Sequence, residues 1–265
     1  MESETESKSN QPSGEPQEFN LVAWWSSIAG ICLIVIISGT FLTRSYLKSH
    51  HQKLEDWRPG IIGRIENDLQ AINRDGTEVT LSQLRGKVYI AGYQYTDCPG
   101  GCLGMASVMK ELLDVYKNDP RFHLVSFSVN PEDDTPEKMD AWVKDKGVES
   151  EKWWFLTSDD PKGFRKYMSS EFKFYKPTEN TDPDVIAARG KYTHDQRLFI
   201  VDEEAHIRGY YGVMHPEGGE TAIKLLKRDL DMVLYPKKKL SDYPVIKMPH
   251  IEVKQNKPDS KKGKE

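Results

Sequence analysis

Two cysteines with three residues between them are the part of this chain best suited to chemistry. Cys98 and Cys102 enclose Pro-Gly-Gly, directly after the apolar run 87–93 and directly before a segment with helical apolar spacing. At such a strand-to-helix junction, the helix dipole and the free backbone N–H groups favour the thiolate form of cysteine. A spacing of four also brings both sulfurs to one side of a first helical turn. The pair can therefore bind one ion together or form a disulfide.

A buried, purely structural role is the competing interpretation of this pair. Two glycines between the cysteines, at a junction that we expect to be exposed, suit access better than burial, so we favour a functional pair. The third cysteine, Cys32, lies inside an apolar run and is expected to act as a small hydrophobic side chain.

A histidine would complete a metal site. Two thiolates and an imidazole form a soft, low-coordinate donor set that suits Cu(I) and can also hold Cu(II), whereas zinc usually requires a fourth ligand. Five of the seven histidines lie in a polar tether, in the C-terminal tail or at the starts of expected strands: His50, His51, His250, His123 and His206. His194 leads directly into the apolar segment 197–202, and His215 follows the last expected strand, so position alone leaves both as candidates.

The elements that would position these residues form an α/β pattern. A β-hairpin with an Asp-Gly turn is expected over 69–80. Buried strands are expected at 87–93, 122–129, 153–156, 197–202 and 207–211, and helices after Cys102, from Thr135, over 160–168 and over 217–234. The stretch 175–192 is expected to be a long loop. The pattern predicts a mixed sheet with helices on both faces, opened by an N-terminal β-hairpin.

An apolar segment near the N-terminus predicts one transmembrane helix. No charged residue occurs between Leu21 and Thr43, and Trp24 and Trp25 stand near one end as interfacial aromatics. A cleaved signal peptide is the alternative, but the acidic first twenty residues and the lack of an Ala-x-Ala site favour an uncleaved anchor. Basic residues cluster after the helix, a bias that by itself would place the following domain in the cytoplasm.

Composition sets the domain organisation. The chain has 265 residues and 37% hydrophobic content, enough for one core of ordinary size. The net charge of −4, with both signs mixed, gives no reason to expect nucleic acid as a partner. The expected segments are a disordered N-terminus (1–20), the anchor (21–43), a tether (44–59), one folded domain (60–235) and a disordered Lys-rich tail (236–265).

Several stretches of this sequence resemble the Sco/SenC family of copper proteins. They are the run from Asp75-Gly76 to Lys87-Val88, the cysteine segment 95–102, the segment 126–136 ending in Asp-Thr-Pro, and Thr193-His194 before the strand 198–202. The resemblance covers about residues 60 to 235, and the ordered combination is more specific than any single motif. It implies a thioredoxin-like fold, with copper held by Cys98, Cys102 and His194.

The resemblance also implies a role, partners and a location. Family members supply the dinuclear copper centre of cytochrome c oxidase, so the implied partners are the copper-bearing oxidase subunit or another copper chaperone. The domain would lie on the extracytoplasmic side of the membrane, in the periplasm or the intermembrane space, against the charge bias around the anchor. This sequence departs from the family pattern at Leu103, where a proline is frequent, and at Asp195, which follows the histidine instead of preceding it. The second departure leaves the orientation of His194 open.

Two other functions compete with a copper chaperone. A membrane-tethered thiol-disulfide reductase would use Cys98 and Cys102 as its catalytic redox pair, although dedicated oxidoreductases usually carry the shorter Cys-x-x-Cys. A peroxiredoxin is disfavoured because Thr96 lies two residues before Cys98, not three. A non-catalytic scaffold on the same fold would leave the cysteines unused.

Overall fold

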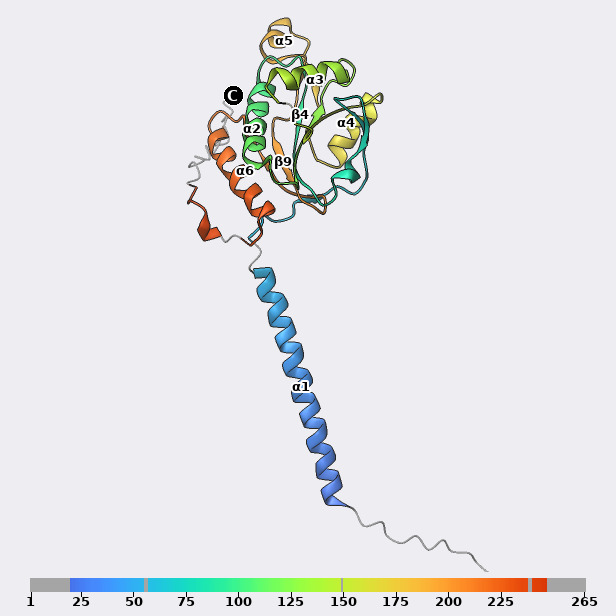
Figure 1. Ribbon diagram of the computed structural model, residues 1–265, viewed down its shortest axis with the longest axis vertical. Helices are drawn as coiled ribbons and strands as arrows, with labels where there is room; N and C mark the ends of the chain where they lie inside the picture. Colours follow the sequence, from blue (N-terminus) through green and yellow to red (C-terminus); the bar gives the residue numbers. More distant parts are fainter. Residues whose placement is uncertain (1–19, 55–56, 149, 238–239, 247–265) are drawn as a thin grey trace, which may run out of the picture. The chain divides into compact units, whose positions relative to one another are not determined.

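The computed structural model describes residues 20–54, 57–148, 150–237 and 240–246 (Figure 1). The chain divides into two compact units, residues 1–55 and 56–265. The helices are α1 Leu21–Leu54, α2 Gly101–Tyr116, α3 Pro136–Asp145, α4 Pro161–Ser170, α5 Pro183–Arg189, α6 Gly219–Leu234 and the 3₁₀ helices η1 Leu81–Leu84 and η2 Leu240–Asp242. The strands are β1 Gly63–Arg64, β2 Gln70–Asn73, β3 Glu78–Thr80, β4 Val88–Gln94, β5 Phe122–Ser128, β6 Trp153–Thr157, β7 Thr178–Glu179, β8 Tyr192–Thr193, β9 Leu198–Val201 and β10 His206–Tyr211.

The first unit contains the apolar helix that the sequence predicts. Its apolar part, Leu21–Leu47, has a mean hydropathy of 2.2, and its most apolar stretch is not buried. The helix is therefore long and apolar enough to cross a membrane or to act as a signal sequence. The side chain of Asn20 caps it by accepting from the backbone N–H of Ala23 at 3.1 Å. The helix continues to Leu54 and so includes most of the segment 44–59 that we expected to be a tether.

The second unit is built on the mixed, thioredoxin-like α/β sheet that the sequence predicts. Its eight strands follow the order β1-β10-β9-β4-β5-β6-β2-β3. The central strands β4, β5 and β6 run parallel, and β9 runs antiparallel to β4 on the other side. The expected N-terminal hairpin is β2–β3, whose turn is closed by Gly76 at a φ of 80°. A separate two-stranded sheet pairs β7 with β8.

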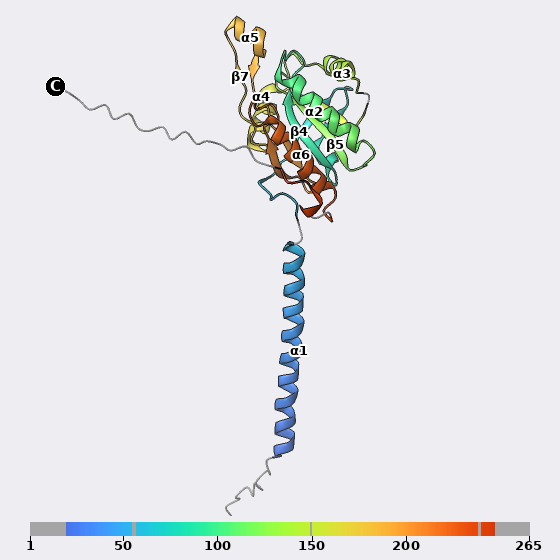
Figure 2. The same ribbon diagram turned by 90° about the vertical axis from the view of Figure 1, so that its left-hand side faces the viewer.

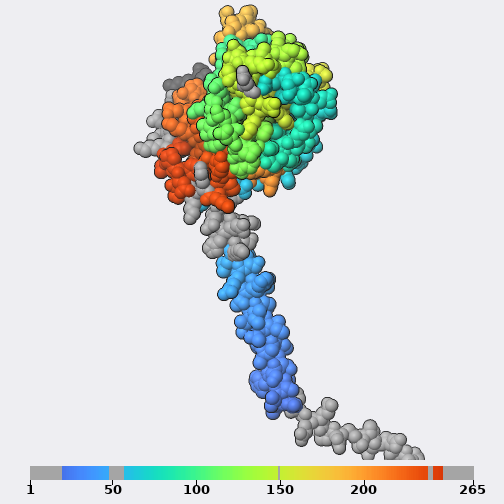
Figure 3. Space-filling view, in the orientation of Figure 1, coloured from blue at the N-terminus to red at the C-terminus, as the bar shows by residue number. Residues whose placement is uncertain are grey.

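Helices cover both faces of the sheet. One apolar cluster joins α2, α3 and α6 to one face, and Figure 2 shows α2 and α6 lying side by side in front of β4 and β5. The other face packs against α4 and an aromatic group contributed by several elements: Phe127, Phe164, Phe172, Phe174 and Phe199. Figure 3 shows side chains covering the face turned to the viewer, with the red surface of α6 beside the green surface of α2. The two clusters fix the sheet on both sides, as expected for a layered α/β domain.

The stretch 175–192, which we expected to be a long loop, contains regular structure. It runs through β7, α5 and β8, and we call 175–193 the excursion. Helix α5 begins where the carboxylate of Asp182 accepts from the N–H of Asp184 at 2.9 Å, with Pro183 at its first position. It ends at Gly190, whose φ is 86°. These Asp-Pro and Gly signals are visible in the sequence, but α5 buries none of its side chains, so no apolar periodicity marks it.

The described part of the C-terminal tail also has some order. Residues 240–246 include η2, and the hydroxyl of Tyr243 donates to a carboxylate oxygen of Asp231 on α6 at 2.7 Å. Most of the predicted disordered segments, 1–19 and 247–265, lie outside the described residues.

A chain of buried hydrogen bonds crosses the centre of the sheet and ends at the cysteine helix. The indole N–H of Trp153 donates to Ser126 at 2.9 Å, and the hydroxyl of Ser126 donates to the side-chain oxygen of Gln94. The amide of Gln94 then donates to the backbone carbonyl of Cys102 at 3.4 Å. Gln94 and Ser126 are fully buried and cannot reach water, so these bonds satisfy polar groups that would otherwise have no hydrogen-bond partner.

We predict that Ser126→Ala destabilises the second unit by about 1 to 3 kcal/mol, because it leaves a donor on Trp153 and an acceptor on Gln94 buried without partners. Urea unfolding followed by tryptophan fluorescence measures this change. Ser107→Ala removes an exposed helical hydroxyl bonded to the carbonyl of Leu103 and serves as the control, with little expected effect. Equal stability of the two variants would contradict the role of the buried chain.

Candidate metal and redox site

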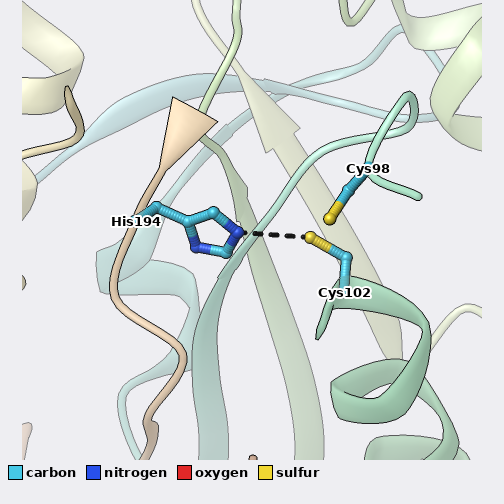
Figure 4. A group of neighbouring side chains, drawn as sticks. All are labelled: Cys98, Cys102 and His194. Carbon is cyan, nitrogen blue, oxygen red and sulfur yellow. Dashed lines mark hydrogen bonds between the residues drawn. The ribbon is translucent and has the colours of Figure 1, made fainter. Parts of the chain in front are cut away.

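Three side chains that are far apart in sequence meet at one edge of the sheet. The sulfurs of Cys98 and Cys102 and a ring nitrogen of His194 all lie within 4.8 Å of one another. The Cys102 sulfur lies 3.4 Å from Nε2 of His194, and Figure 4 shows the ring pointing at the two sulfurs. At these separations small side-chain rotations suffice for one ion to contact all three atoms.

Sheet topology explains why they meet. The cysteine loop follows the end of β4, and His194 lies just before the start of β9. Because β9 is antiparallel to β4 and Leu198 pairs with Gly92, the start of one strand lies beside the end of the other. The β8 strand ends at Thr193 and delivers His194 to this edge.

Both cysteines are more buried than the exposed junction that the sequence led us to expect. The exposed fraction is 5% for Cys98 and 0% for Cys102. The excursion accounts for part of the difference: a Cβ on Gly190 would lie 3.0 Å from the ring of Pro99 and 2.0 Å from the hydroxyl of Tyr95. The end of α5 therefore lies against the cysteine loop, and Gly190 is the residue that permits this close approach.

The two thiols have opposite electrostatic environments. A hydrogen bond from Cys102 is the main reason why the pKa of Cys98 falls to about 4, with further hydrogen bonds from the backbone N–H groups of Gly100 and Cys102. Burial raises the pKa of Cys102 well above its ordinary value. The reduced pair therefore holds one thiolate, at Cys98, and one protonated thiol, at Cys102.

The imidazole of His194 presents its free nitrogen to the sulfurs. Its Nδ1 lies 2.8 Å from the backbone carbonyl of Asp195, and because a carbonyl only accepts, Nδ1 carries the proton. Nε2, which faces Cys102, then has the lone pair that a metal ion would bind. The carboxylate of Asp195 does not orient this ring: it accepts from Arg197 Nε at 2.8 Å and from the N–H of Tyr175 at 3.1 Å. A backbone carbonyl thus supplies the orientation that the sequence left open.

Tyr95 joins the cysteine loop to the excursion, a role that the sequence did not indicate. Its hydroxyl accepts from the N–H of Tyr192 at 3.3 Å and lies 3.4 Å from the carbonyls of Arg189 and Tyr192, to which it can donate. Its ring packs edge-on against His194, with 5.6 Å between ring centroids. One buried side chain therefore contacts both the histidine and the segment that precedes it.

Asp134 anchors the segment before the cysteines. Its carboxylate accepts from the N–H and the hydroxyl of Thr96 at 3.1 and 2.6 Å, and from the hydroxyl of Ser128. The side chain is almost fully buried, and burial raises its pKa. The sequence showed Asp-Thr-Pro only as a helix start, and Thr135 does cap α3 as predicted, by accepting from the N–H of Lys138. A local pattern does not show that the preceding carboxylate reaches Thr96.

The other histidines have different roles. His215, the alternative candidate, accepts from the N–H groups of Glu217 and Gly218 at 3.3 and 3.2 Å and so holds the turn before α6. His206 contacts the carboxylate of Asp202 at 3.3 Å. The side chains of His50, His51 and His250 lie outside the described residues. Among the residues that the structure describes, Cys98, Cys102 and His194 form the only group of three or more metal-binding side chains of the Cys, His, Asp and Glu types.

Comparison with known proteins gives consistent matches over the second unit. The family model described as SCO1/SenC matches residues 62–229. The SCO1 protein homolog of Bacillus subtilis is 26% identical over 143 residues, which are 53% of this chain and 70% of that protein. Among solved structures, a SCO1/SenC family lipoprotein from Bacillus anthracis is similar with a TM-score of 0.53 and 24% identity, over 63% of this chain and 96% of that one. BsSco, a member of the Sco family of cytochrome c oxidase assembly proteins for which a disulfide switch is described, is similar with a TM-score of 0.52 and 22% identity, over 67% and 96%.

We predict that the reduced pair titrates asymmetrically. In a Cys32→Ser background, one ultraviolet thiolate absorption should disappear as the pH falls through about 4, and Cys98→Ser should remove this step. Because folding lowers this pKa from 9.0, the Cys98 thiolate stabilises the fold fully above pH 9, progressively less as the pH falls, and not at all below about pH 4. Two thiols that both titrate near 9 would show that the hydrogen bonds to Cys98 do not form in solution.

Proposed function

This chain belongs to the SCO1/SenC family, and from that premise we propose that it is a membrane-anchored copper chaperone. In this proposal it binds copper as cargo through Cys98, Cys102 and His194 and assists assembly of the copper centre of cytochrome c oxidase. The observation that carries the proposal is the convergence of two sulfurs and one free imidazole nitrogen within 4.8 Å. Two soft sulfur donors and one nitrogen suit Cu(I) and also accept Cu(II).

The protonation states of the site support reversible metal binding. Cys98 is a thiolate before any metal arrives, whereas Cys102 must release a proton to become a ligand. Burial disfavours a bare thiolate at Cys102, and a bound cation offsets that cost. Copper binding should therefore release a proton and should strengthen as the pH rises. The same property lets a proton compete for Cys102 during release of the metal.

The half-buried His194 is the ligand on the open side of the site, because both cysteines are nearly inaccessible. A receiving protein would therefore approach from the histidine side and exchange ligands there. We propose the copper-bearing subunit of the oxidase, or another copper chaperone, as this partner. The described function of BsSco as an oxidase assembly protein supports this choice.

The domain organisation and location are part of the same proposal. We assign 21–43 as an uncleaved anchor, 44–59 as the tether and 60–235 as the Sco/SenC domain, with 1–20 and 236–265 as the ends of the chain. The domain would lie on the extracytoplasmic side, in the periplasm or the intermembrane space. The apolar helix Leu21–Leu47 and the similarity to a family lipoprotein, another membrane-attached form, support anchoring.

A thiol-disulfide reductase is the second candidate, and the asymmetry of the two thiols favours it. The Cys98 thiolate would attack a partner's disulfide, forming a mixed disulfide and releasing one partner thiolate. Cys102, once deprotonated, would attack the Cys98 sulfur and release the second partner thiolate. The partner gains two electrons, and the chain is left with a Cys98–Cys102 disulfide.

We predict that the reduced chain binds one Cu(I), and that Cys98→Ser and Cys102→Ser each weaken binding by at least about 100-fold because a two-sulfur site loses half its soft donors. Competition titration with a Cu(I) chelator measures the affinity. His215→Ala is the matched control and should leave it unchanged, since His215 bonds to the turn before α6 and lies outside the group of three donors. Unchanged affinity in both cysteine variants would eliminate the copper site.

His194→Ala separates the two functions. Copper coordination needs the imidazole, whereas exchange between two sulfurs does not, so copper affinity should fall about tenfold or more while disulfide reduction continues. Copper titration and a disulfide-reduction assay on the same variant give both values. Intact copper binding together with lost reductase activity would favour the enzyme over the chaperone.

We predict that the anchor places the domain outside the cytoplasm, despite the basic residues that follow the apolar segment. A reporter fused after Glu265 that is active only when exported should be active. Activity of a cytoplasm-only reporter at the same junction would show that the charge bias, and not the family, sets the orientation.

A further inference from the structure

A basic groove lies on the face of the domain that α4 covers. It encloses about 530 Å³, and we define it by the residues that line it: Lys162, Arg165, Lys166 and Ser169 of α4, and Lys176 and Pro177 of the excursion. The helical residues share one side of α4, because their spacing follows the helical repeat. Phe164 and Met168 face the core from the opposite side of the same helix. The groove is thus the solvent side of α4 together with the first residues of the excursion.

The groove carries positive charge that the described part of the chain does not neutralise. Arg165 is neutralised, because both ends of its guanidinium bond to the carboxylate of Glu132, one of them at 2.8 Å. Lys162, Lys166 and Lys176 are exposed and form no ion pair with a carboxylate in the described ranges. Lys162 and Lys166 stand one helical turn apart, where like charges repel. An anionic group in the groove would relieve this repulsion.

The groove lies at the same end of the sheet as the three metal-binding side chains. Arg165 donates to the carbonyl of Val129, directly after the end of β5, at 3.2 Å. The other wall, Lys176–Pro177, leads into β7, which pairs with β8, the strand that ends next to His194. The chain enters the domain at the opposite end, where β1 pairs with His206 and Ile207. A molecule in the groove would therefore lie beside the site and away from the entry of the tether.

We propose that the basic groove docks an acidic segment of the protein that exchanges copper with this site. The inference rests on the proposed function, for which it names the chemistry of the partner. Side chains one helical turn apart have Cβ atoms about 5 to 6 Å apart, so Lys162 and Lys166 match two carboxylates at alternate positions of an extended segment, about 6 to 7 Å apart. An anionic lipid surface is the competing occupant, and measurements with lipid vesicles separate it from an acidic segment.

The test uses the full, copper-free chain in nanodiscs of zwitterionic lipid. The probe is a fluorescent ten-residue peptide with alternating Glu and Gly, and its Gln-Gly counterpart reports binding that does not depend on charge. Fluorescence anisotropy at low salt measures affinity, which should decrease as salt screens the charges. We expect Lys162→Glu/Lys166→Glu to weaken binding of the acidic peptide by about tenfold or more.

Lys224→Glu/Lys227→Glu is the matched control. It makes the same charge change on the exposed side of α6, where these lysines pair with Glu220 and Glu111. The control should retain most of the binding. Equal losses in both double variants, or equal binding of the Gln-Gly peptide, would overturn the proposal. If inorganic phosphate displaces the peptide at matched ionic strength, the groove binds simple anions and the proposal of an acidic segment is wrong.

Two further outcomes separate this inference from its alternatives. If phosphatidylserine vesicles bind in a manner that depends on Lys162 and Lys166 while the acidic peptide does not bind, the groove belongs to lipid and the proposal fails. The copper titration is independent of both measurements, because the peptide is tested on metal-free protein. If the chain binds the peptide through the groove but does not bind copper, the proposed function is wrong, and the groove remains a binding site for acidic segments.

Discussion

The antiparallel pairing of β4 with β9 is the constraint on which the site depends. It places the end of one strand beside the start of the other, and so it joins residues 92 positions apart in sequence. The flanking contacts serve this arrangement. Gln94, the last residue of β4, donates to the carbonyl of Cys102, and Asp134 holds the segment before Cys98. The cysteine pair is thus supported from the sheet beneath it and from the neighbouring loop, and the histidine arrives from the other strand.

Burial and charge act in opposite directions on two neighbouring sulfurs, and the difference gives the pair its chemistry. Cys98 receives hydrogen bonds that stabilise its thiolate, whereas Cys102 has lost its contact with water and keeps its proton. Such a pair is ready to act as a nucleophile and also ready to accept a soft cation. One geometry therefore supports both candidate functions. The free nitrogen of His194 is the feature that only the metal site requires.

Much of the fold could be predicted from sequence, because its elements leave local signals, whereas the choice of His194 over His215 came only from the family resemblance. The Asp-Gly turn, the apolar strands and the capped start of α3 are visible within a few residues, and the structure contains each of them. The burial of the cysteines could not be predicted, because it depends on the excursion, whose α5 has no buried side chains to give it a periodic pattern. The contacts of Tyr95 and Asp134 were missed for a similar reason: each joins segments whose proximity exists only after the strands pair.

The separation of the donors along the chain has a consequence for biosynthesis. The ribosome completes β4, the cysteine loop and α2 before it makes the excursion and β9, so during this interval the two sulfurs have neither the histidine nor the covering segment beside them. A nascent chain at that stage holds an accessible dithiol that an oxidising compartment can convert to a disulfide or join to another protein. Pairing of β9 with β4 ends this vulnerable period. Occupancy of all three donors by one ion is then possible only in a chain whose C-terminal half has folded, so metal loading would distinguish finished molecules from incomplete ones.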